Sequence, residues 1–165
     1  MIMGEMIKVG MADLNVCKAP DSLTTLGLGS CIGACIYDPT AKIAGMVHFM
    51  LPDSTRIKCN QNKAKFGDTG ILELIRRMEA EGAVRRRMVA KIAGGAKMFA
   101  LAAGSNLSSL NIGDNNIESA RTNLKALGIK IIAEDVALNY GRTIEFYADD
   151  GRLLIKSVGH ENKII

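Results

Sequence analysis

The chain has 165 residues and a formal net charge of +4, and 48% of its residues are hydrophobic whereas only 4% are aromatic. This length favours a single domain, residues 1–165, with a core of aliphatic side chains. No apolar run approaches the roughly 18 residues of a membrane helix, and the first residues lack the pattern of a secretory signal. These features argue against insertion into a membrane and predict a cytoplasmic protein with reduced thiols.

The first half of the chain is rich in predicted strands. Apolar stretches bounded by turn residues predict four of them, at residues 7–16, 23–27, 32–37 and 42–49. The last two would form a hairpin around the turn Asp38-Pro39-Thr40-Ala41. The polar stretch 52–66 predicts a loop beside any site that this hairpin carries.

Helices and strands alternate in the second half. Asp68 is predicted to cap a helix that ends at Gly82, and a second helix is predicted from Asp114 to a stop at Gly128. Both have apolar residues at spacings of three and four. The remaining predicted strands are 88–93, 129–133, 142–148 and 153–158, followed by a tail, 159–165, that we expect to fray. This order predicts a layered mixed α/β (α+β) domain and not a doubly wound sheet.

The one obvious basic cluster, Arg85-Arg86-Arg87, does not indicate nucleic-acid binding. No aromatic residues accompany it to provide a stacking platform for bases. A solvated helix end explains it better.

A cysteine and one of only two histidines flank the predicted hairpin. His48 follows Cys31 by 17 residues. If Tyr37 pairs with Lys42, Cys31 lies directly opposite His48, where opposed side chains share a face and are close enough for a thiol–imidazole contact. An imidazole at that distance can activate a thiol as a nucleophile. The spacing therefore permits a catalytic pair, which we expect to open onto solvent.

The residues before the cysteine are compatible with the same chemistry. Glycines allow a tight turn, so the amides around Gly29, Ser30 and Cys31 are candidates for stabilising an oxyanion. An alternative is that Cys31 is an inert, buried thiol and that His48 is a core histidine bonded to a carbonyl. A cysteine with a distant histidine does not by itself separate these readings.

The other cysteines predict no metal or disulfide framework. Cys17, Cys31, Cys35 and Cys59 contain no C-x-x-C pair, and the spacing of the middle two is not that of a zinc site. We expect no metal and no cofactor, with Cys17, Cys35 and Cys59 serving as packing residues or bystanders.

Several strings resemble the signature of the chemoreceptor glutamine deamidases, the CheD family. Specific ones are Thr25-Leu-Gly-Leu-Gly-Ser-Cys31, the turn Tyr37-Asp38-Pro39, and Met46-Val-His48-Phe-Met-Leu-Pro52. Weaker ones follow in the expected order at 65–69, 91–99, 111–113 and 133–135. The resemblance covers most of the chain, and the departures, such as Cys59 and Asn60, lie outside the signature.

The resemblance implies a site, a fold and partners. The family's catalytic cysteine, histidine and threonine correspond to Cys31, His48 and Thr25, although Thr25 is also an ordinary strand residue. The implied fold is a mixed β-sandwich core flanked by helices, similar to the deamidase domain of the cytotoxic necrotising toxins. The implied substrates are glutamines on the cytoplasmic helices of chemoreceptors (methyl-accepting chemotaxis proteins), which the enzyme converts to glutamate. The chemotaxis phosphatase CheC is a second implied partner, and an exposed Phe99 is a candidate contact or a core residue.

Two other functions remain open at this point. The chain is alternatively a binding module that regulates the phosphatase or the receptors without catalysis. It is alternatively a transglutaminase, which shares the thioester intermediate but resolves it with an amine in place of water.

Overall fold

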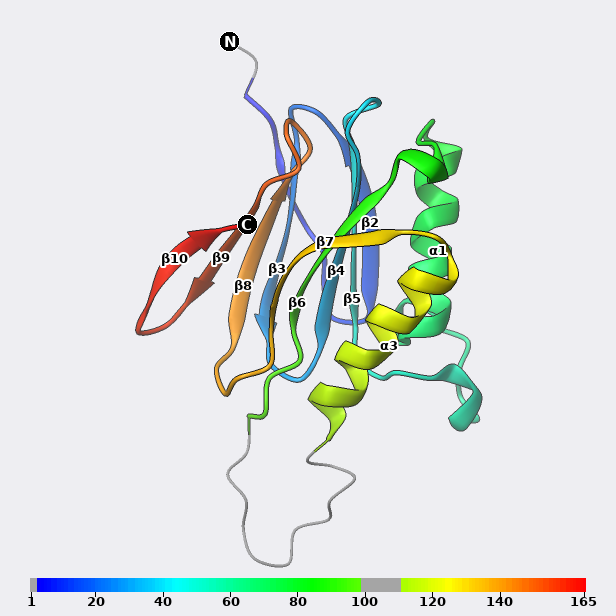
Figure 1. Cartoon of the computed structure of the whole chain (residues 1–165), viewed down its shortest axis with the longest axis vertical. Coiled ribbons are helices and arrows are strands. Elements are labelled where there is room, and N and C mark those ends of the chain that lie inside the picture. Colours follow the sequence, from blue (N-terminus) through cyan, green and yellow to red (C-terminus); the bar gives the residue numbers. More distant parts are fainter. Residues whose placement is uncertain (1–2, 99–110) are drawn as a thin grey trace, which may run out of the picture.

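Two five-stranded sheets form the framework of the computed structural model, which describes residues 3–98 and 111–165. The first sheet has the order β1-β3-β8-β9-β10 and the second β2-β5-β4-β6-β7. Helices α1 (Gly67–Ala80) and α3 (Ile112–Ala126) lie along the outer face of the second sheet (Figure 1). This arrangement confirms the predicted mixed α+β fold with helices against a sheet core. Neither described helix has the length and apolar character needed to span a membrane.

Most strands lie close to their predicted positions. Their bounds are β1 Met6–Lys8, β2 Asp13–Lys18, β3 Ser22–Leu28, β4 Ile32–Asp38, β5 Ile43–Phe49, β6 Val89–Gly94, β7 Lys130–Val136, β8 Arg142–Tyr147, β9 Leu153–Ser157 and β10 His160–Ile164. Strands β4 and β5 are buried along their whole length, because one face meets the first sheet and the other meets the helices.

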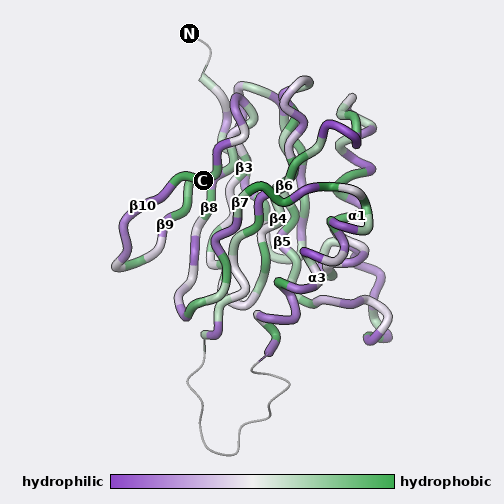
Figure 2. Tube along the Cα trace, in the orientation of Figure 1, coloured by the Kyte–Doolittle hydropathy of each residue, from purple (hydrophilic) through white to green (hydrophobic). Residues whose placement is uncertain are grey.

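Two apolar cores result from this layering. One lies between the sheets and includes Leu23, Cys35, Met46 and Phe146, and the other lies between the second sheet and the helices. Side chains alternate between these two cores along β4 and β5. Figure 2 shows the apolar residues gathered in the strands between the layers, with hydrophilic residues along β10 at the periphery.

Two predictions about the ends of the sheets are wrong. The single strand expected at residues 7–16 is two strands in different sheets, because the chain crosses over at Gly10–Ala12, where Ala12 adopts a φ of 58°. The tail expected to fray forms β10 against β9, and Lys163 Nζ donates to Asp135 Oδ1 over 2.8 Å. A polar strand has no apolar pattern that predicts it. Its pairing, this ion pair, the stacking of His160 on Tyr140 and the bond from Lys91 Nζ to Ile165 O hold it in place.

The helices keep their predicted apolar stripes but not the predicted cap. Asp68 lies in the first turn of α1 and not at its N-cap. Its carboxylate accepts hydrogen bonds from the backbone and the hydroxyl of Ser54, at 3.0 and 2.7 Å. These bonds hold the 52–66 segment against the helix. The segment was predicted to be a loop, and its helical structure is limited to two short 3-10 turns. The expected contact residue Phe99 lies outside the described residues.

Candidate active site

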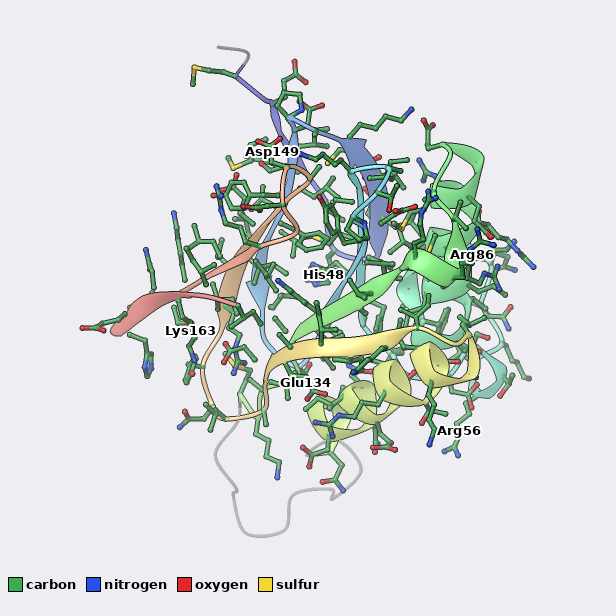
Figure 3. The ribbon with its side chains drawn as sticks, turned by 45° about the horizontal axis from the view of Figure 1, so that its top comes forward. His48, Arg56, Arg86, Glu134, Asp149 and Lys163 are labelled. Carbon is green, nitrogen blue, oxygen red and sulfur yellow. The ribbon has the colours of Figure 1, made fainter. Side chains whose placement is uncertain are left out.

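The predicted site residues lie at one end of the strands that carry them. Thr25 contacts His48 directly, whereas no hydrogen bond joins the Cys31 sulfur to either nitrogen of His48, so the expected direct thiol–imidazole contact is not formed. Thr25 lies on β3, His48 on β5, and Cys31 immediately before β4. Because the even-numbered side chains of β5 belong to the core between the sheets, His48 points across it towards the first sheet, from which Thr25 comes. Figure 3 shows His48 in the interior, far from labelled surface groups such as Arg86.

The hairpin is paired two residues away from the predicted register. Gly33, and not Cys31, lies opposite His48, because Asp38 pairs with Ile43 and the turn is one residue further along on each side. The Asp38 carboxylate accepts from the amides of Thr40 and Ala41 and so closes this turn. A shift of two residues keeps every side chain on its predicted face. Cys31 is therefore a diagonal neighbour of His48 on the same face, a position that a histidine side chain can bridge.

Hydrogen bonding to Thr25 fixes the protonation of the imidazole. The Thr25 hydroxyl lies 2.7 Å from Val9 O and 2.7 Å from His48 Nδ1. A hydroxyl has one proton, and the Val9 carbonyl can only accept it. Nδ1 must then donate its own proton to the Thr25 oxygen. The other ring nitrogen, Nε2, is left unprotonated, and it is buried without a hydrogen-bond partner among the described residues.

Burial keeps both members of the pair neutral. Desolvation lowers the pKa of His48 below 6.5, since the charged imidazolium loses its hydration. Burial also raises the pKa of Cys31 above 9.0, although a hydrogen bond from its own backbone amide acts in the opposite direction. The resting site is thus a thiol and a neutral imidazole with a free lone pair, and not a thiolate–imidazolium ion pair.

The segment before Cys31 is held by backbone bonds that the sequence did not predict. Gly95 N donates to Cys31 O and Ala96 N to Gly29 O, both over 2.9 Å. A Cβ at Gly94 would collide with the carbonyl oxygen of Cys31, so glycine is needed there for the close approach. The amides of Ser30 and Cys31 donate to no backbone carbonyl of the described residues, and the Cys31 amide donates to its own sulfur.

Sequence reasoning also missed Asn116. This residue of α3 is fully buried, and its side-chain amide donates to Ser30 O and to Met50 O, each over 2.9 Å. The one signal in the sequence is its position, since Asn116 falls on the helix face that carries Ile117 and Ala120. A polar residue on an apolar face indicates a specific hydrogen-bonding role.

The site is more enclosed than expected. Thr25 and His48 are each 1% exposed and Cys31 is also buried, so the expectation that the cluster opens onto solvent is wrong. Cys31 keeps 8% of its surface exposed, and Gly29 and Ser30 beside it are half-buried. Access to the cluster therefore runs past the nucleophile segment and not past the histidine.

The other three cysteines differ in burial. Cys17 and Cys35 are buried and Cys59 is exposed, and all four cysteines are free thiols. Within residues 3–98 and 111–165, no three or more His, Cys, Asp or Glu side chains gather in a way that would hold a metal ion.

Comparison with known proteins gives consistent matches along the chain. A family model described as "CheD chemotactic sensory transduction" matches residues 50–157, which excludes the segment with Thr25, Cys31 and His48. Full-length relatives include that segment. A "Probable chemoreceptor glutamine deamidase CheD" of Lachnoclostridium phytofermentans is 61% identical over 99% of this chain and 100% of its own length.

Two further relatives extend the match to other bacteria. One of the same description from Caldanaerobacter subterraneus subsp. tengcongensis is 54% identical over 98% of both chains. The "Chemoreceptor glutamine deamidase CheD" of Halalkalibacterium halodurans is 47% identical over 99% of this chain and 100% of its own. Such identity, sustained from one end of the chain to the other, agrees with the family model, and the chain belongs to the CheD family.

Proposed function

We propose that the chain is a protein-glutamine deamidase that converts glutamine to glutamate on the cytoplasmic helices of chemoreceptors. The names of its full-length relatives support the reaction and the substrate class. The observation that carries the mechanism is the bond between Thr25 Oγ1 and His48 Nδ1, which leaves Nε2 as a free base on the face shared with Cys31. In this proposal Cys31 is the nucleophile, His48 the general base and acid, and Thr25 the residue that orients the imidazole.

The first half of the reaction releases ammonia. The Cys31 thiol gives its proton to His48 Nε2 as the sulfur attacks the side-chain carbonyl carbon of the glutamine. The negative charge on the carbonyl oxygen is stabilised by the backbone amides of Ser30 and Cys31, which donate to no backbone carbonyl of the described residues. The imidazolium then returns its proton to the amide nitrogen, the carbon–nitrogen bond breaks, and ammonia leaves a glutamyl thioester.

The second half consumes water. His48 Nε2 takes a proton from a water molecule, whose oxygen attacks the thioester carbon. The carbon–sulfur bond breaks, the sulfur recovers the proton from the imidazolium, and the product is a glutamate side chain. Water is the only co-reactant, and the enzyme returns to its neutral starting state.

The hydroxyl of Thr25 can orient the imidazole of His48 in both the neutral and the protonated state without stabilising the positive charge strongly. In many triads a carboxylate occupies this position and stabilises the charged ring. A neutral hydroxyl that has already donated its proton to Val9 O accepts the Nδ1–H bond in both charge states but adds no full charge. This is consistent with the lowered pKa of His48, because no charged group among the described residues compensates for the lost hydration of the ring.

Narrow access to Cys31 favours a substrate with a long side chain. The sulfur-bearing residue is 8% exposed, and the histidine behind it is 1% exposed. A glutamine presents its carboxamide at the end of two methylene groups, beyond the backbone of the helix that carries it. Conversion to glutamate adds a negative charge, which is a local electrostatic switch on the receptor.

An ammonia-release assay on a receptor cytoplasmic fragment, with and without a primary amine, tests the proposal. A deamidase releases ammonia in both conditions and leaves glutamate. A transglutaminase releases ammonia but attaches the amine to the receptor, and a binding module releases none. Stoichiometric amine incorporation, or absence of ammonia release from a folded and bound receptor fragment, would contradict the deamidase assignment.

We also propose the phosphatase CheC as a partner. The support for this partner is the resemblance of this chain to the CheD family. The expected contact residue Phe99 lies outside the described residues.

A further inference from the structure

Asn116 occupies the point at which the two strands of the catalytic hairpin separate. The pairing of β4 with β5 ends at Ile32 and Phe49. Continued in the same register, the next pair would be Cys31 with Met50, but Met50 N instead donates to Lys65 O. The Asn116 side chain bridges this opening by donating to Ser30 O and Met50 O.

The orientation of the amide is unambiguous. Both partners are backbone carbonyls, which can only accept hydrogen bonds, so the nitrogen of the side chain must face them. Its carbonyl oxygen, Oδ1, is then buried with no partner among the described residues. A side chain present only to fill the core would not leave a buried acceptor unpaired, because such a group is costly. The two donated bonds are therefore the reason for an asparagine at this position.

We propose that Asn116 is a positioning residue that fixes the nucleophile segment relative to the strand of the base. It acts through Ser30, the residue before Cys31, and through Met50, two residues after His48. It replaces the ladder bonds that β4 and β5 lack beyond Ile32 and Phe49, and it anchors both segments to helix α3. The inference rests on the proposed roles of Cys31 and His48, but it concerns their alignment and not the identity of the substrate.

Misalignment has a specific kinetic consequence. A displacement of about 1 Å between reacting groups can lower a rate by roughly 100-fold. Asn116 is fully buried and makes both of its bonds to main-chain carbonyls, so its loss should alter kcat and leave KM for a receptor fragment nearly unchanged.

The test compares Asn116→Leu with Ser119→Ala in a Cys59→Ser background. Ser119 lies on the same helix, and its hydroxyl donates to Pro52 O over 2.7 Å. Ser119→Ala therefore removes a bond from α3 to the segment that follows β5 and leaves the bond to Ser30 intact. The exposed thiol of Cys59 is removed, and mass spectrometry of the peptides separates alkylation of Cys31 by iodoacetamide, which is 8% exposed, from that of Cys17, which is 6% exposed. The first readout is the alkylation rate of Cys31 at neutral pH, which depends on transfer of the thiol proton to His48.

Asn116→Leu should lower this rate by roughly 10-fold or more, to the level of His48→Ala, while Ser119→Ala stays near the parent rate. The second readout, deamidation of a receptor fragment, should show a matching fall in kcat. A fall in alkylation without any deamidation by the parent would support the inference and overturn the proposed function. A folded Asn116→Leu protein that alkylates at the parent rate would overturn the inference, as would an equal loss in Ser119→Ala.

A second variant covers a failure to fold. Asn116→Asp has nearly the same shape but turns an acceptor towards both carbonyls, and thermal melting establishes which variants are folded. If Asn116→Asp is folded, a fall of the same size in the alkylation rate of Cys31 supports the inference. An alkylation rate equal to that of the parent overturns it. Failure of both variants to fold while Ser119→Ala folds would overturn a role confined to positioning.

Discussion

At the scale of single residues, the site depends on one hydroxyl proton. Thr25 has two hydrogen-bond partners, and one of them, Val9 O, can only accept. That constraint determines which nitrogen of His48 is protonated and leaves Nε2 free. The sequence cannot reveal this arrangement, because Val9 lies in the connection after β1 and contributes only a backbone atom.

Replacing this hydroxyl should affect catalysis more than folding. We expect Thr25→Val to lower kcat by roughly 10- to 100-fold, since the ring loses the acceptor that fixes its tautomer, whereas Thr25→Ser keeps most of the activity. Steady-state kinetics on a receptor fragment measure the effect, and nitrogen NMR of His48 should show protonation at Nδ1 in the parent protein. A Thr25→Val variant with parental kcat would remove Thr25 from the mechanism.

The neutral resting state predicts a characteristic pH profile. The base is lost when pH falls through the pKa of His48, which burial places below 6.5, and the thiol ionises as pH rises towards the pKa of Cys31, which burial places above 9.0. We therefore expect kcat/KM to be level across the neutral range, with an acid limb below pH 6.5 and any alkaline change above pH 9.0. An acid limb above pH 6.5 would indicate a stabilised imidazolium and contradict the neutral pair. Circular dichroism over the same range controls for unfolding.

At the scale of elements, the far end of the catalytic hairpin is held by a buried carboxylate. Burial by itself would raise the pKa of Asp38, but hydrogen bonds from Arg87 and from the amides of Val84, Ala41 and Thr40 lower it to about 2. The Arg87 guanidinium approaches it to 2.9 Å. This end of the hairpin sets the register, and therefore which residues lie opposite one another at the site.

Asp38→Asn should destabilise the fold without changing the chemistry. A pKa lowered from 3.8 to about 2 corresponds to about 2 kcal/mol of folding free energy, present above pH 3.8 and lost as pH falls through 2. Urea unfolding at neutral pH should show this loss, and the difference from the parent should shrink between pH 3.8 and 2. The exposed Glu161→Gln is the control and should change stability by less than about 0.5 kcal/mol. An unchanged stability in Asp38→Asn would mean that the turn does not depend on this carboxylate.

The predictions made from sequence succeed where side-chain periodicity carries the information. The stripe Ile71, Leu74, Ile75 and Met78 of α1 is buried as expected, and the faces of β4 and β5 are correct. The hairpin register and the Asp68 cap were wrong, because they depend on partners distant in sequence. The turn closes at Asp38 and Ile43 in the presence of Arg87, and Asp68 bonds to Ser54 and does not cap its helix.

At the scale of the whole molecule, the two sheets and one helix meet at the site. The first sheet contributes Thr25, the second contributes His48 and the segment of Cys31, and α3 contributes Asn116. Membership of the family followed from the signature around Cys31 and His48, and it is confirmed by the comparisons. The position of Asn116 on an apolar helix face indicates a hydrogen-bonding role, but its partners Ser30 and Met50 are defined only by packing, as is the close approach of Gly94 to the Cys31 carbonyl. The catalytic roles of Cys31, His48 and Thr25 stay predictions.

The central claim is that Cys31 forms a thioester with a receptor glutamine that water resolves. It is tested most directly by mass spectrometry of a receptor cytoplasmic fragment incubated in water enriched in the heavy oxygen isotope. Cys35, a buried thiol on β4 that lies in the same core between the sheets, provides the matched control. We expect the parent and Cys35→Ala to convert glutamine to glutamate, with one heavy oxygen atom in every glutamate formed. Cys31→Ala should convert no glutamine. Conversion by a folded Cys31→Ala protein, or an equal loss in both variants, would contradict the account.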